Sequence, residues 1–247
     1  MSDPQGLAEL VSLEGRVAVV TGGAGGIGSV VVRQLLDAGA DVVSADVHGA
    51  DCVEGAVQFS CDVGDICSVE RLVAAVNRCW DGMDLLVHCA GITSDAVLWK
   101  MSMDAWDKVL STNLSSAFYL LRGFAPLMRK RQRGSVVLVS SINGERGKFG
   151  QANYAASKSG LIGLARTAAR ELGAFGIRVN VISPGLIRTP MMDVLADEHV
   201  EAAIQETVLG RVGEPDDIAR SVLFLVSEMS RHVTGQVLRV DGGQLIA

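Results

Sequence analysis

The sequence has no long basic run and no long apolar run. Its formal net charge is −6, and its one basic cluster, RKRQR at residues 129–133, is short. We therefore expect no nucleic-acid partner, and we interpret the cluster as a solvated helix end. The longest apolar runs have the length of strands, so no membrane span is predicted. The start of the chain, MSDPQGLAEL, lacks the pattern of a signal peptide, which favours a cytoplasmic protein without a membrane partner.

Cysteine and histidine are sparse and scattered. The five cysteines form no C-x-x-C pair, and the four histidines lack the spacing of zinc ligands. An odd number of cysteines without such pairs is typical of reduced thiols in a cytosolic protein. The sequence therefore predicts neither a disulfide framework nor a metal site, and packing is the expected role of each cysteine.

Aromatic residues are also few. They make up 4% of the chain, whereas hydrophobic residues make up 49%, so the core must consist mainly of Ala, Val, Leu and Ile. Such a core suits a parallel sheet that helices cover on both faces. The 247 residues are within the range that α/β folds fill as one domain, and no linker or repeat marks a second one.

What the sequence does contain is a regular alternation of apolar runs with helical segments. The apolar runs are RVAVVT, DVVSAD, AVQFSC, DLLVHC, SVVLVSS, RVNVIS and QVLRVDGG. Strands that alternate with helices form βαβ units, and right-handed crossovers turn these into a doubly wound sheet. The prediction is thus α/β: a single doubly wound (Rossmann-type) domain over residues 1–247, with a seven-stranded, mainly parallel sheet flanked by helices.

The helices are predicted between these runs. We expect them at about 27–38, after Asp65, at about 104–130, at about 152–175 and from Pro215 onward. The span between 184 and 213 is long and irregular for a compact domain unless it forms a functional lid. We predict a substrate lid at about 189–210, with a helix in ADEHVEAAIQET.

A glycine-rich turn follows the first predicted strand. Residues 21–28 read TGGAGGIG, and the residues after them have a helical pattern. Glycines let the backbone approach a pyrophosphate, while a helix N-terminus presents N–H groups and partial positive charge to it. A tight turn without a ligand is the alternative, but the βαβ context favours a dinucleotide site.

The acid at the end of the second strand indicates which dinucleotide is bound. A carboxylate at Asp46 can accept hydrogen bonds from the ribose hydroxyls of NAD, and it would repel the 2′-phosphate of NADP. No Lys or Arg lies in the glycine turn or directly follows Asp46, and His48 is the only nearby residue that could bind a phosphate. We therefore expect NAD(H) to be preferred over NADP(H). A solvated turn acid is the alternative for Asp46.

Further motifs occur in a fixed order along the chain. T-G-x-x-x-G-x-G and STNLSSAF are followed by a serine that stands thirteen residues before Y-x-x-x-K, and then by SPGLIRTP. With these motifs the chain resembles the short-chain dehydrogenase/reductase family over residues 13–243. Within that family, NGERGKFGQANYAASKSG and the ending VDGG are similar to the 3-oxoacyl-(acyl carrier protein) and acetoacetyl-CoA reductases.

The resemblance implies a set of site residues. The family's N-N-A-G after the fourth strand reads HCAG at 88–91 here, so only the last two positions carry over, and His88 is expected to be a hydrogen-bonded core residue. The implied catalytic residues are Asn113, Ser141, Tyr154 and Lys158. The implied cofactor-binding residues are Gly22, Gly26, Ile27, Gly28, Asp46, Asp62, Val63, Ala90, Gly91, Tyr154, Lys158, Pro184, Gly185, Ile187 and Thr189.

The chemistry of these residues fits hydride transfer to a ketone. Reduction leaves an alkoxide that needs a proton, and Tyr154 is the expected acid. Lys158, one helical turn away, shares a face with Tyr154 and is expected to lower its pKa. Ser141 would donate a hydrogen bond to the substrate oxygen. By resemblance, Lys158 also binds the nicotinamide ribose, and Asn113 holds a water that links Lys158 to solvent.

These features predict an NAD(H)-dependent oxidoreductase that interconverts a ketone and a secondary alcohol. The first choice of substrate is a 3-oxoacyl thioester and its 3-hydroxyacyl form. One alternative is an NAD-dependent dehydrogenase of a free secondary alcohol, such as a steroid, a sugar or a xenobiotic, because biosynthetic acyl reductases commonly prefer NADPH. A regulator that senses NAD without turnover is another. The resemblance also implies a homo-oligomer, a tetramer.

Overall fold

The computed structural model describes residues 6–47, 53–192 and 197–246. His48 and residues 193–196 of the predicted lid therefore lie outside the described residues. The described strands are β1 (Val17–Thr21), β2 (Asp41–Asp46), β3 (Val57–Ser60), β4 (Leu85–His88), β5 (Gly134–Val139), β6 (Ile177–Pro184) and β7 (Val237–Val240). They form one sheet in the order β3-β2-β1-β4-β5-β6-β7, and every neighbouring pair is parallel. The predicted fold class is confirmed.

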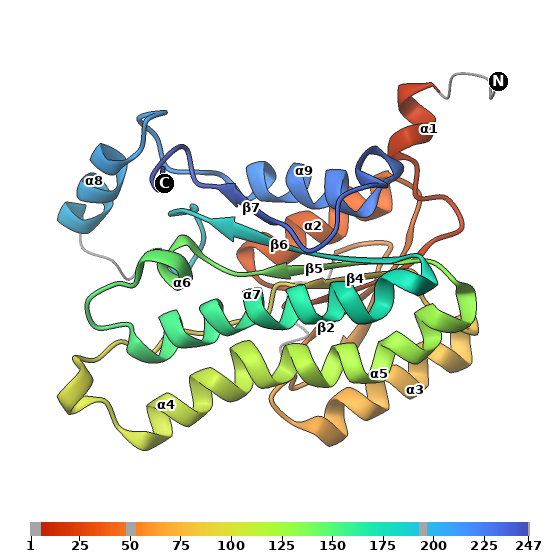
Figure 1. Ribbon diagram of the computed structural model, residues 1–247, viewed down its shortest axis with the longest axis horizontal. Coiled ribbons are helices and arrows are strands. Elements are labelled where there is room, and N and C mark those ends of the chain that lie inside the picture. Colours follow the sequence, from red (N-terminus) through yellow and green to blue (C-terminus); the bar gives the residue numbers. More distant parts are fainter. Residues whose placement is uncertain (1–5, 48–52, 193–196, 247) are drawn as a thin grey trace.

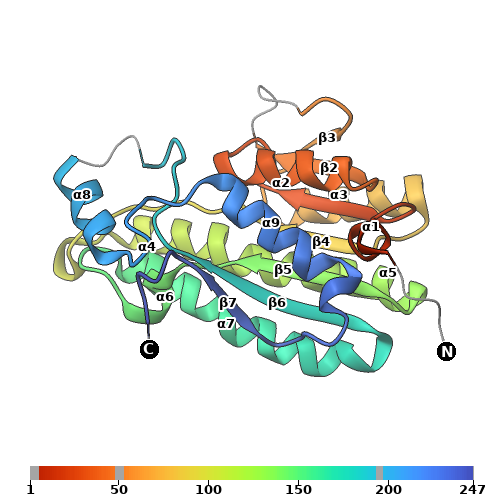
Figure 2. The ribbon, with the colours of Figure 1, turned by 90° about the horizontal axis from the view of Figure 1, so that it is seen from above.

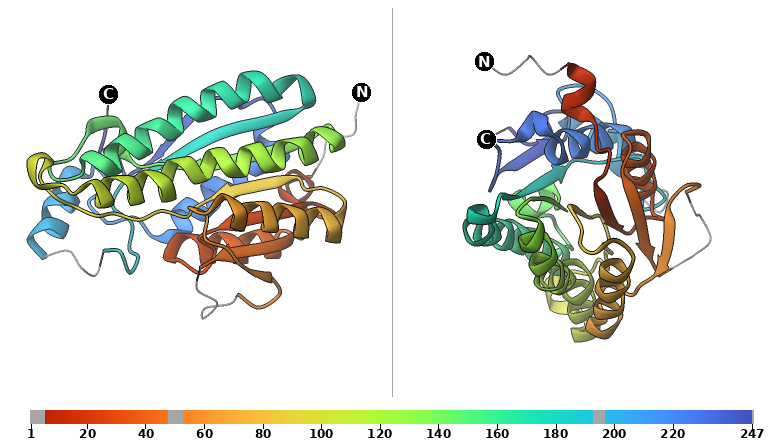
Figure 3. Two further views of the ribbon diagram at one scale, coloured as in Figure 1. Left: turned by 90° about the horizontal axis from the view of Figure 1, so that it is seen from below. Right: turned by 90° about the vertical axis from the view of Figure 1, so that its right-hand side faces the viewer.

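Helices cover both faces of this sheet. Those described are α1 (Leu7–Val11), α2 (Gly26–Asp37), α3 (Ile66–Trp80), α4 (Met103–Leu110), α5 (Ser116–Arg131), α6 (Ile142–Arg146), α7 (Ala152–Leu172), α8 (Asp197–Glu206) and α9 (Pro215–Val226). Figures 1 and 2 show α2 and α9 on one face and α3, α5 and α7 on the other. Figure 3 shows the same layers from below and from one end. No helix in the described ranges is long and apolar enough to cross a membrane.

The strand pattern explains why helices must cover both faces. All five residues of β1 are buried, and alternate residues point to opposite faces. Val17 and Val19 pack with α3, α5 and α7, whereas Ala18 and Val20 pack with α2 and α9. A strand buried on both faces needs apolar residues at nearly every position, so β1 reads as an aliphatic run that ends at Thr21, whose hydroxyl lies in hydrogen-bond contact with His88.

The observed helix ends follow the expected signals, with one interruption. Asp65 caps α3 by accepting a hydrogen bond from the backbone N–H of Cys67. Pro215 opens α9, where Glu214 and Asp217 form a capping box. The helix predicted at about 104–130 is divided into α4 and α5 by a π-helical turn, η2 (Ser111–Ser115).

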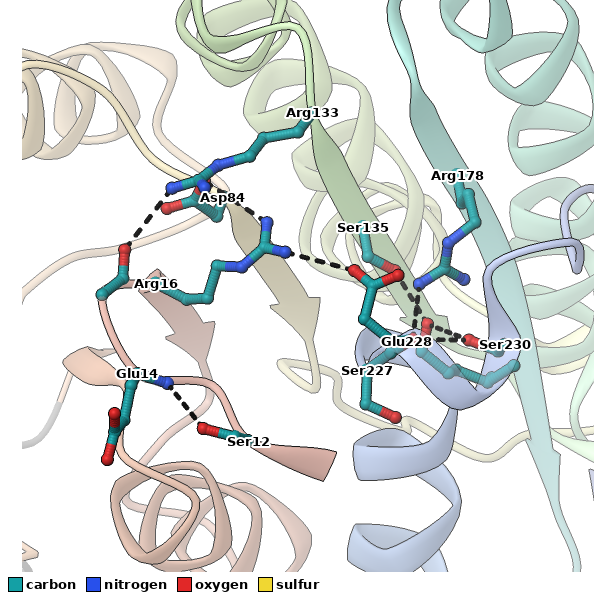
Figure 4. A network of polar contacts seen from close by, with 12 residues as sticks. Ser12, Glu14, Arg16, Asp84, Arg133, Ser135, Arg178, Ser227, Glu228 and Ser230 are labelled. Atoms are coloured by element: carbon teal, nitrogen blue, oxygen red, sulfur yellow. Dashed lines mark hydrogen bonds and ion pairs between the residues drawn. The ribbon is translucent and has the colours of Figure 1, made fainter. Parts of the chain in front are cut away.

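A buried carboxylate joins the elements at the amino ends of the strands. Asp84 is fully buried, and its carboxylate accepts hydrogen bonds from the backbone N–H of Val17 (3.0 Å), from Arg131 (2.6 Å) and from Arg133 (2.6 Å). Figure 4 shows Arg133 beside Asp84. The interpretation of 129–133 as a solvated helix end was therefore wrong for these two arginines, because a buried carboxylate requires paired charge and they supply it.

We expect Asp84→Asn to lower the free energy of unfolding by about 3 kcal/mol, because it removes one partner of a buried charge cluster. Urea unfolding followed by circular dichroism measures this. Asp81→Asn is the matched control: its ion pair with Lys130 is exposed and its left-handed φ of 49° tolerates Asn. The control should hardly move the unfolding midpoint, and equal losses in both variants would contradict the role given to Asp84.

Candidate active site

The carboxyl ends of the strands open into one large cavity. Its volume is about 1380 Å³, and it is lined by the segments that follow β1 to β6, with α6 and α8 at the same end of the sheet (Figure 1). The strand order reverses between β1 and β4, and doubly wound sheets bind ligands at such a switch point. All the site residues predicted from the sequence line this cavity except Asn113, which lies behind its wall.

The turn after β1 has no space for side chains. Gly22 has a φ of 68°, and a Cβ added to it would lie 2.7 Å from the backbone N of Ala90. A Cβ on Gly28 would lie 1.9 Å from the carbonyl oxygen of Gly22. α2 begins directly after this turn, and its N-cap, Gly25, makes no side-chain hydrogen bond. A bare backbone at a helix N-terminus fits the pyrophosphate of a dinucleotide.

Two acids lie beside this turn on the cavity wall. Asp46 ends β2, and its Oδ2 accepts a hydrogen bond from the backbone N–H of Ala24 at 3.1 Å. Asp62 follows β3, where its Oδ1 accepts a hydrogen bond from the backbone N–H of Gly64 at 2.9 Å. Val63, which follows Asp62 in the chain, is buried. Both acids, which the sequence predicts to face the adenosine half of a dinucleotide, therefore line the cavity.

Lys158 is held inside the protein. Lys158 is only 4% exposed, and its Nζ donates a hydrogen bond to the backbone carbonyl oxygen of Val139 at 2.8 Å. Nζ also lies 5.6 Å from the centroid of the Tyr154 ring. A Cβ added to Gly91 would lie 3.2 Å from this nitrogen, so the loop after β4 passes close to it. Burial lowers the pKa of Lys158 to about 8.

Burial raises the pKa of Tyr154. A hydrogen bond with Ser141 opposes this effect, and the negative charge of Asp95 adds to it. The expectation of a lowered pKa was therefore wrong for this arrangement, because the loss of solvation is the largest effect on the phenol and it disfavours the phenolate. Tyr154 is a neutral phenol at pH 7, the form that can donate a proton.

Ser141 and Asn113 are the other two predicted catalytic residues besides Tyr154 and Lys158. Ser141 is the N-cap of α6, and its hydroxyl accepts a hydrogen bond from the backbone N–H of Asn143. Asn113 lies in the π-helical turn; its amide exchanges hydrogen bonds with the backbone N–H and C=O of Ile92 (2.8 and 2.9 Å) and donates to Ser157 (3.1 Å). Asn113 therefore joins the loop after β4 to α7, next to Lys158.

The two residues that depart from the family pattern are structural. His88 is buried, with Nδ1 2.7 Å from the Thr21 hydroxyl and Nε2 3.1 Å from the Ser116 hydroxyl. Burial lowers the pKa of His88 to about 3, so its ring is neutral. Burial raises the pKa of the Cys89 thiol to about 12, which makes it unreactive. The prediction of a hydrogen-bonded core histidine is confirmed.

The loop after β6 closes against the glycine turn. Pro184 ends β6, and a Cβ on Gly185 would lie 2.8 Å from the Gln244 side chain. Ile187 is buried, and a Cβ on Gly26 would lie 2.8 Å from the Thr189 side chain. The loop predicted to contact the nicotinamide thus reaches the turn predicted to hold the phosphates.

Sequence reasoning missed a belt of polar side chains around the cavity. Hydrogen bonds connect them from the loop after β4 to α6, α8 and the C-terminal segment, including an Arg146–Glu206 ion pair of 2.8 Å. None belongs to a periodic pattern, and the only signal was the density of polar residues in NGERGKFGQ. The belt consists of Thr93, Asp95, Asn143, Arg146, Gln151, Glu206 and Gln244.

Comparison with known proteins agrees with the fold and the site. The family model described as enoyl-(acyl carrier protein) reductase matches residues 22–244. The chain belongs to the short-chain dehydrogenase/reductase family, whose members are nicotinamide-dependent oxidoreductases acting on CH–OH groups. It is accordingly an oxidoreductase that interconverts a ketone and a secondary alcohol by hydride transfer.

Two relatives and one solved structure illustrate this similarity. The chain is 40% identical to the 3-oxoacyl-(acyl-carrier-protein) reductase FabG of Thermotoga maritima, over 95% of this chain and 99% of the relative. It is 39% identical to the (3R)-3-hydroxyacyl-CoA dehydrogenase of Canis lupus familiaris, over 96% and 99%. The crystal structure of gox2181 aligns with a TM-score of 0.91 at 32% identity, covering 96% of this chain and 98% of that one.

Gly28→Ala should weaken nucleotide binding, because the added methyl group would overlap the Gly22 carbonyl and displace the turn. We expect the affinity for a nicotinamide dinucleotide to fall at least about tenfold, as measured by calorimetry. Gly173→Ala is the control, since a Cβ there meets nothing within 4 Å, and it should bind like the parent protein. Unchanged binding by folded Gly28→Ala would exclude the turn from the nucleotide site.

Proposed function

We propose that this protein reduces the ketone of a 3-oxoacyl thioester to the 3-hydroxyacyl form and can catalyse the reverse reaction. The observation that carries the proposal is that Tyr154, Ser141 and the buried Lys158 share one wall of the dinucleotide cavity, with Lys158 Nζ 5.6 Å from the centroid of the Tyr154 ring. A bound nicotinamide would supply or accept the hydride at this place.

The residues of the chain supply the proton and the charge stabilisation. The Ser141 hydroxyl donates a hydrogen bond to the ketone oxygen, and Tyr154 gives its phenolic proton to that oxygen as negative charge develops. With a pKa of about 8, the Lys158 ammonium can return a proton to the phenolate at neutral pH. Asn113 joins the loop after β4 to α7 through Ile92 and Ser157, so it holds the helix that carries Lys158 and Tyr154 against that loop.

The printed activities of the relatives favour a thioester substrate. Both the Thermotoga maritima and the Canis lupus familiaris proteins are named for C3 chemistry on acyl thioesters. The cavity wall also presents the apolar side chains of Met191 and Met192, which suit an acyl chain. The description of the matching family model gives a second candidate, reduction of an enoyl thioester, which has to be tested in parallel.

Tyr154→Phe should lower kcat for acetoacetyl-CoA reduction by about 10²-fold or more, because the transition state loses its proton donor. Nucleotide binding should be retained. Initial rates with acetoacetyl-CoA and with crotonyl-CoA separate the two candidates. Tyr119→Phe, which changes the only other tyrosine, should keep full activity. A Tyr154→Phe enzyme with parental turnover would refute the proposed acid.

We also infer that NAD(H) is preferred over NADP(H). The support is Asp46, which β2 places on the cavity wall against the glycine turn, where its charge would oppose a 2′-phosphate. The ratio of kcat/KM for NADH to that for NADPH should exceed one. Asp46→Asn should reduce this ratio about tenfold, equivalent to about 1.4 kcal/mol.

Asp41→Asn is the control for charge alone. It changes an exposed acid at the opposite end of the same strand, and it should leave the nucleotide ratio unchanged. A parent protein that prefers NADPH would overturn the cofactor inference while leaving the ketone chemistry intact.

The remaining inferences concern the whole protein. We infer a cytoplasmic homotetramer, organised as one domain over residues 1–247, that acts without nucleic-acid or membrane partners. We infer further that the segment at about 189–210 works as a substrate lid. The support for the lid is α8, which borders the cavity and joins α6 through the Glu206–Arg146 ion pair. Light scattering of the purified protein tests the assembly.

A further inference from the structure

The loop after β4 makes three hydrogen bonds with the start of α7, the helix that carries Tyr154. The backbone N–H of Ala96 donates to the carbonyl oxygen of Gly150 at 2.9 Å. The side chain of Asn153, fully buried, donates to the carbonyl oxygen of Ser94 at 3.0 Å. The third contact is between Gln151, which precedes α7, and Asp95, at 2.9 Å. Tyr154 lies in this same turn, so its position depends on the loop.

Both side chains in the Asp95–Gln151 contact also form hydrogen bonds with other residues. One carboxylate oxygen of Asp95 accepts from the Thr93 hydroxyl and the other from the Gln151 amide. The amide oxygen of Gln151 accepts from Asn143 at 3.1 Å. Gln151 is 8% exposed, and its carbonyl oxygen accepts the backbone hydrogen bond from Ala155. Because the amide oxygen and the amide nitrogen of Gln151 are both hydrogen-bonded, the side chain holds the start of α7 in one orientation.

We propose that Asp95 is a positioning residue of the hydride-transfer site, which anchors the first turn of α7 through Gln151 and places its negative charge beside the turn that carries Tyr154. The proposal rests on the proposed role of Tyr154 as the acid. It adds a residue outside the Asn113, Ser141, Tyr154 and Lys158 set, from a loop that sequence motifs did not mark.

The charge of Asp95 acts on Tyr154 in a defined direction. A carboxylate near a phenol disfavours the phenolate, and Asp95 contributes to the raised pKa of Tyr154 after burial, the larger cause. Removing that charge should let Tyr154 ionise at lower pH. Other titratable or charged groups line the same cavity, and they include Lys158 on α7, Cys89 after β4, Lys108 on α4, Arg146 on α6, Lys148 before α7, and His199 and Glu206 on α8.

Two substitutions separate the charge from the anchor. Asp95→Asn can keep both contacts, because its amide oxygen accepts from Gln151 while its NH₂ donates to the Thr93 hydroxyl, which can also accept. It therefore removes only the charge. Asp95→Ala removes the anchor as well. Asp107→Asn, an exposed acid on α4 that does not line the cavity, is the control for net charge.

The direct readout is NMR of protein labelled with ¹³C at tyrosine Cζ, followed against pH. The chain has two tyrosines, so the spectrum holds two signals, and Tyr154→Phe assigns them. We expect the Tyr154 signal of Asp95→Asn to move toward the phenolate shift at lower pH than in the parent protein and in Asp107→Asn. The Tyr119 signal should stay where it is. Superimposed Tyr154 curves for parent and Asp95→Asn would overturn the proposal.

Kinetics complete the test. The alkaline fall in kcat for acetoacetyl-CoA reduction should begin at lower pH in Asp95→Asn, because the phenol is lost earlier. Asp95→Ala should lose about tenfold or more in kcat while keeping its circular dichroism spectrum, since small misplacements of an acid are costly. Parental kcat in Asp95→Ala would contradict the anchoring role. An NMR shift in Asp95→Asn without turnover of any thioester would refute only the proposed substrate.

Discussion

The site depends on one buried positive charge. Lys158 has its ammonium withdrawn from water, and a charge in that position is stable only where fixed dipoles face it. The carbonyl oxygen of Val139 faces it at the end of β5, and the close approach of Gly91 and Gly144 leaves no space for larger residues nearby. The register of α7 against β5 is therefore set by this lysine, and Tyr154, one turn earlier, is placed with it.

The fold supplies what the lysine needs. Because β4 and β5 are parallel neighbours, their carboxyl ends lie at the same end of the sheet. The strand order reverses between β1 and β4, and the cavity opens at that place. The π-helical turn places Asn113 between the loop after β4 and α7, where its side chain connects Ile92 to Ser157. At the opposite edge, Asp84 secures the amino ends of the strands with arginines.

Much of this arrangement was predictable because it follows local rules. Aliphatic runs flanked by turns identified every strand of the sheet, and Asp65 and Pro215 marked helix starts through their capping chemistry. The glycine turn, Asp46, Tyr154 and Lys158 could be predicted as site residues because each needs a particular residue type at a particular spacing, and all of them line the one cavity. The resulting prediction of a nicotinamide-dependent oxidoreductase agrees with the family to which the chain belongs.

The rest depends on contacts between distant segments, which no local pattern reports. Arg131 and Arg133 look like a solvated helix end until the fold brings Asp84 beside them. The bond between Asp95 and Gln151 spans 56 positions, and neither residue has a distinctive neighbourhood in the sequence. The pKa of Tyr154 was expected to fall because its lysine is near in sequence, whereas burial, a property of the whole fold, raises it.

The central claim is that this site transfers a hydride to the ketone carbon of a 3-oxoacyl thioester. The most direct measurement uses reduced nicotinamide dinucleotide in which both C4 hydrogens are deuterium, with acetoacetyl-CoA as substrate and mass spectrometry of the product. The account predicts 3-hydroxybutyryl-CoA that carries a single deuterium at C3. A product without deuterium, or conversion of crotonyl-CoA to butyryl-CoA while acetoacetyl-CoA is left unchanged, would contradict it.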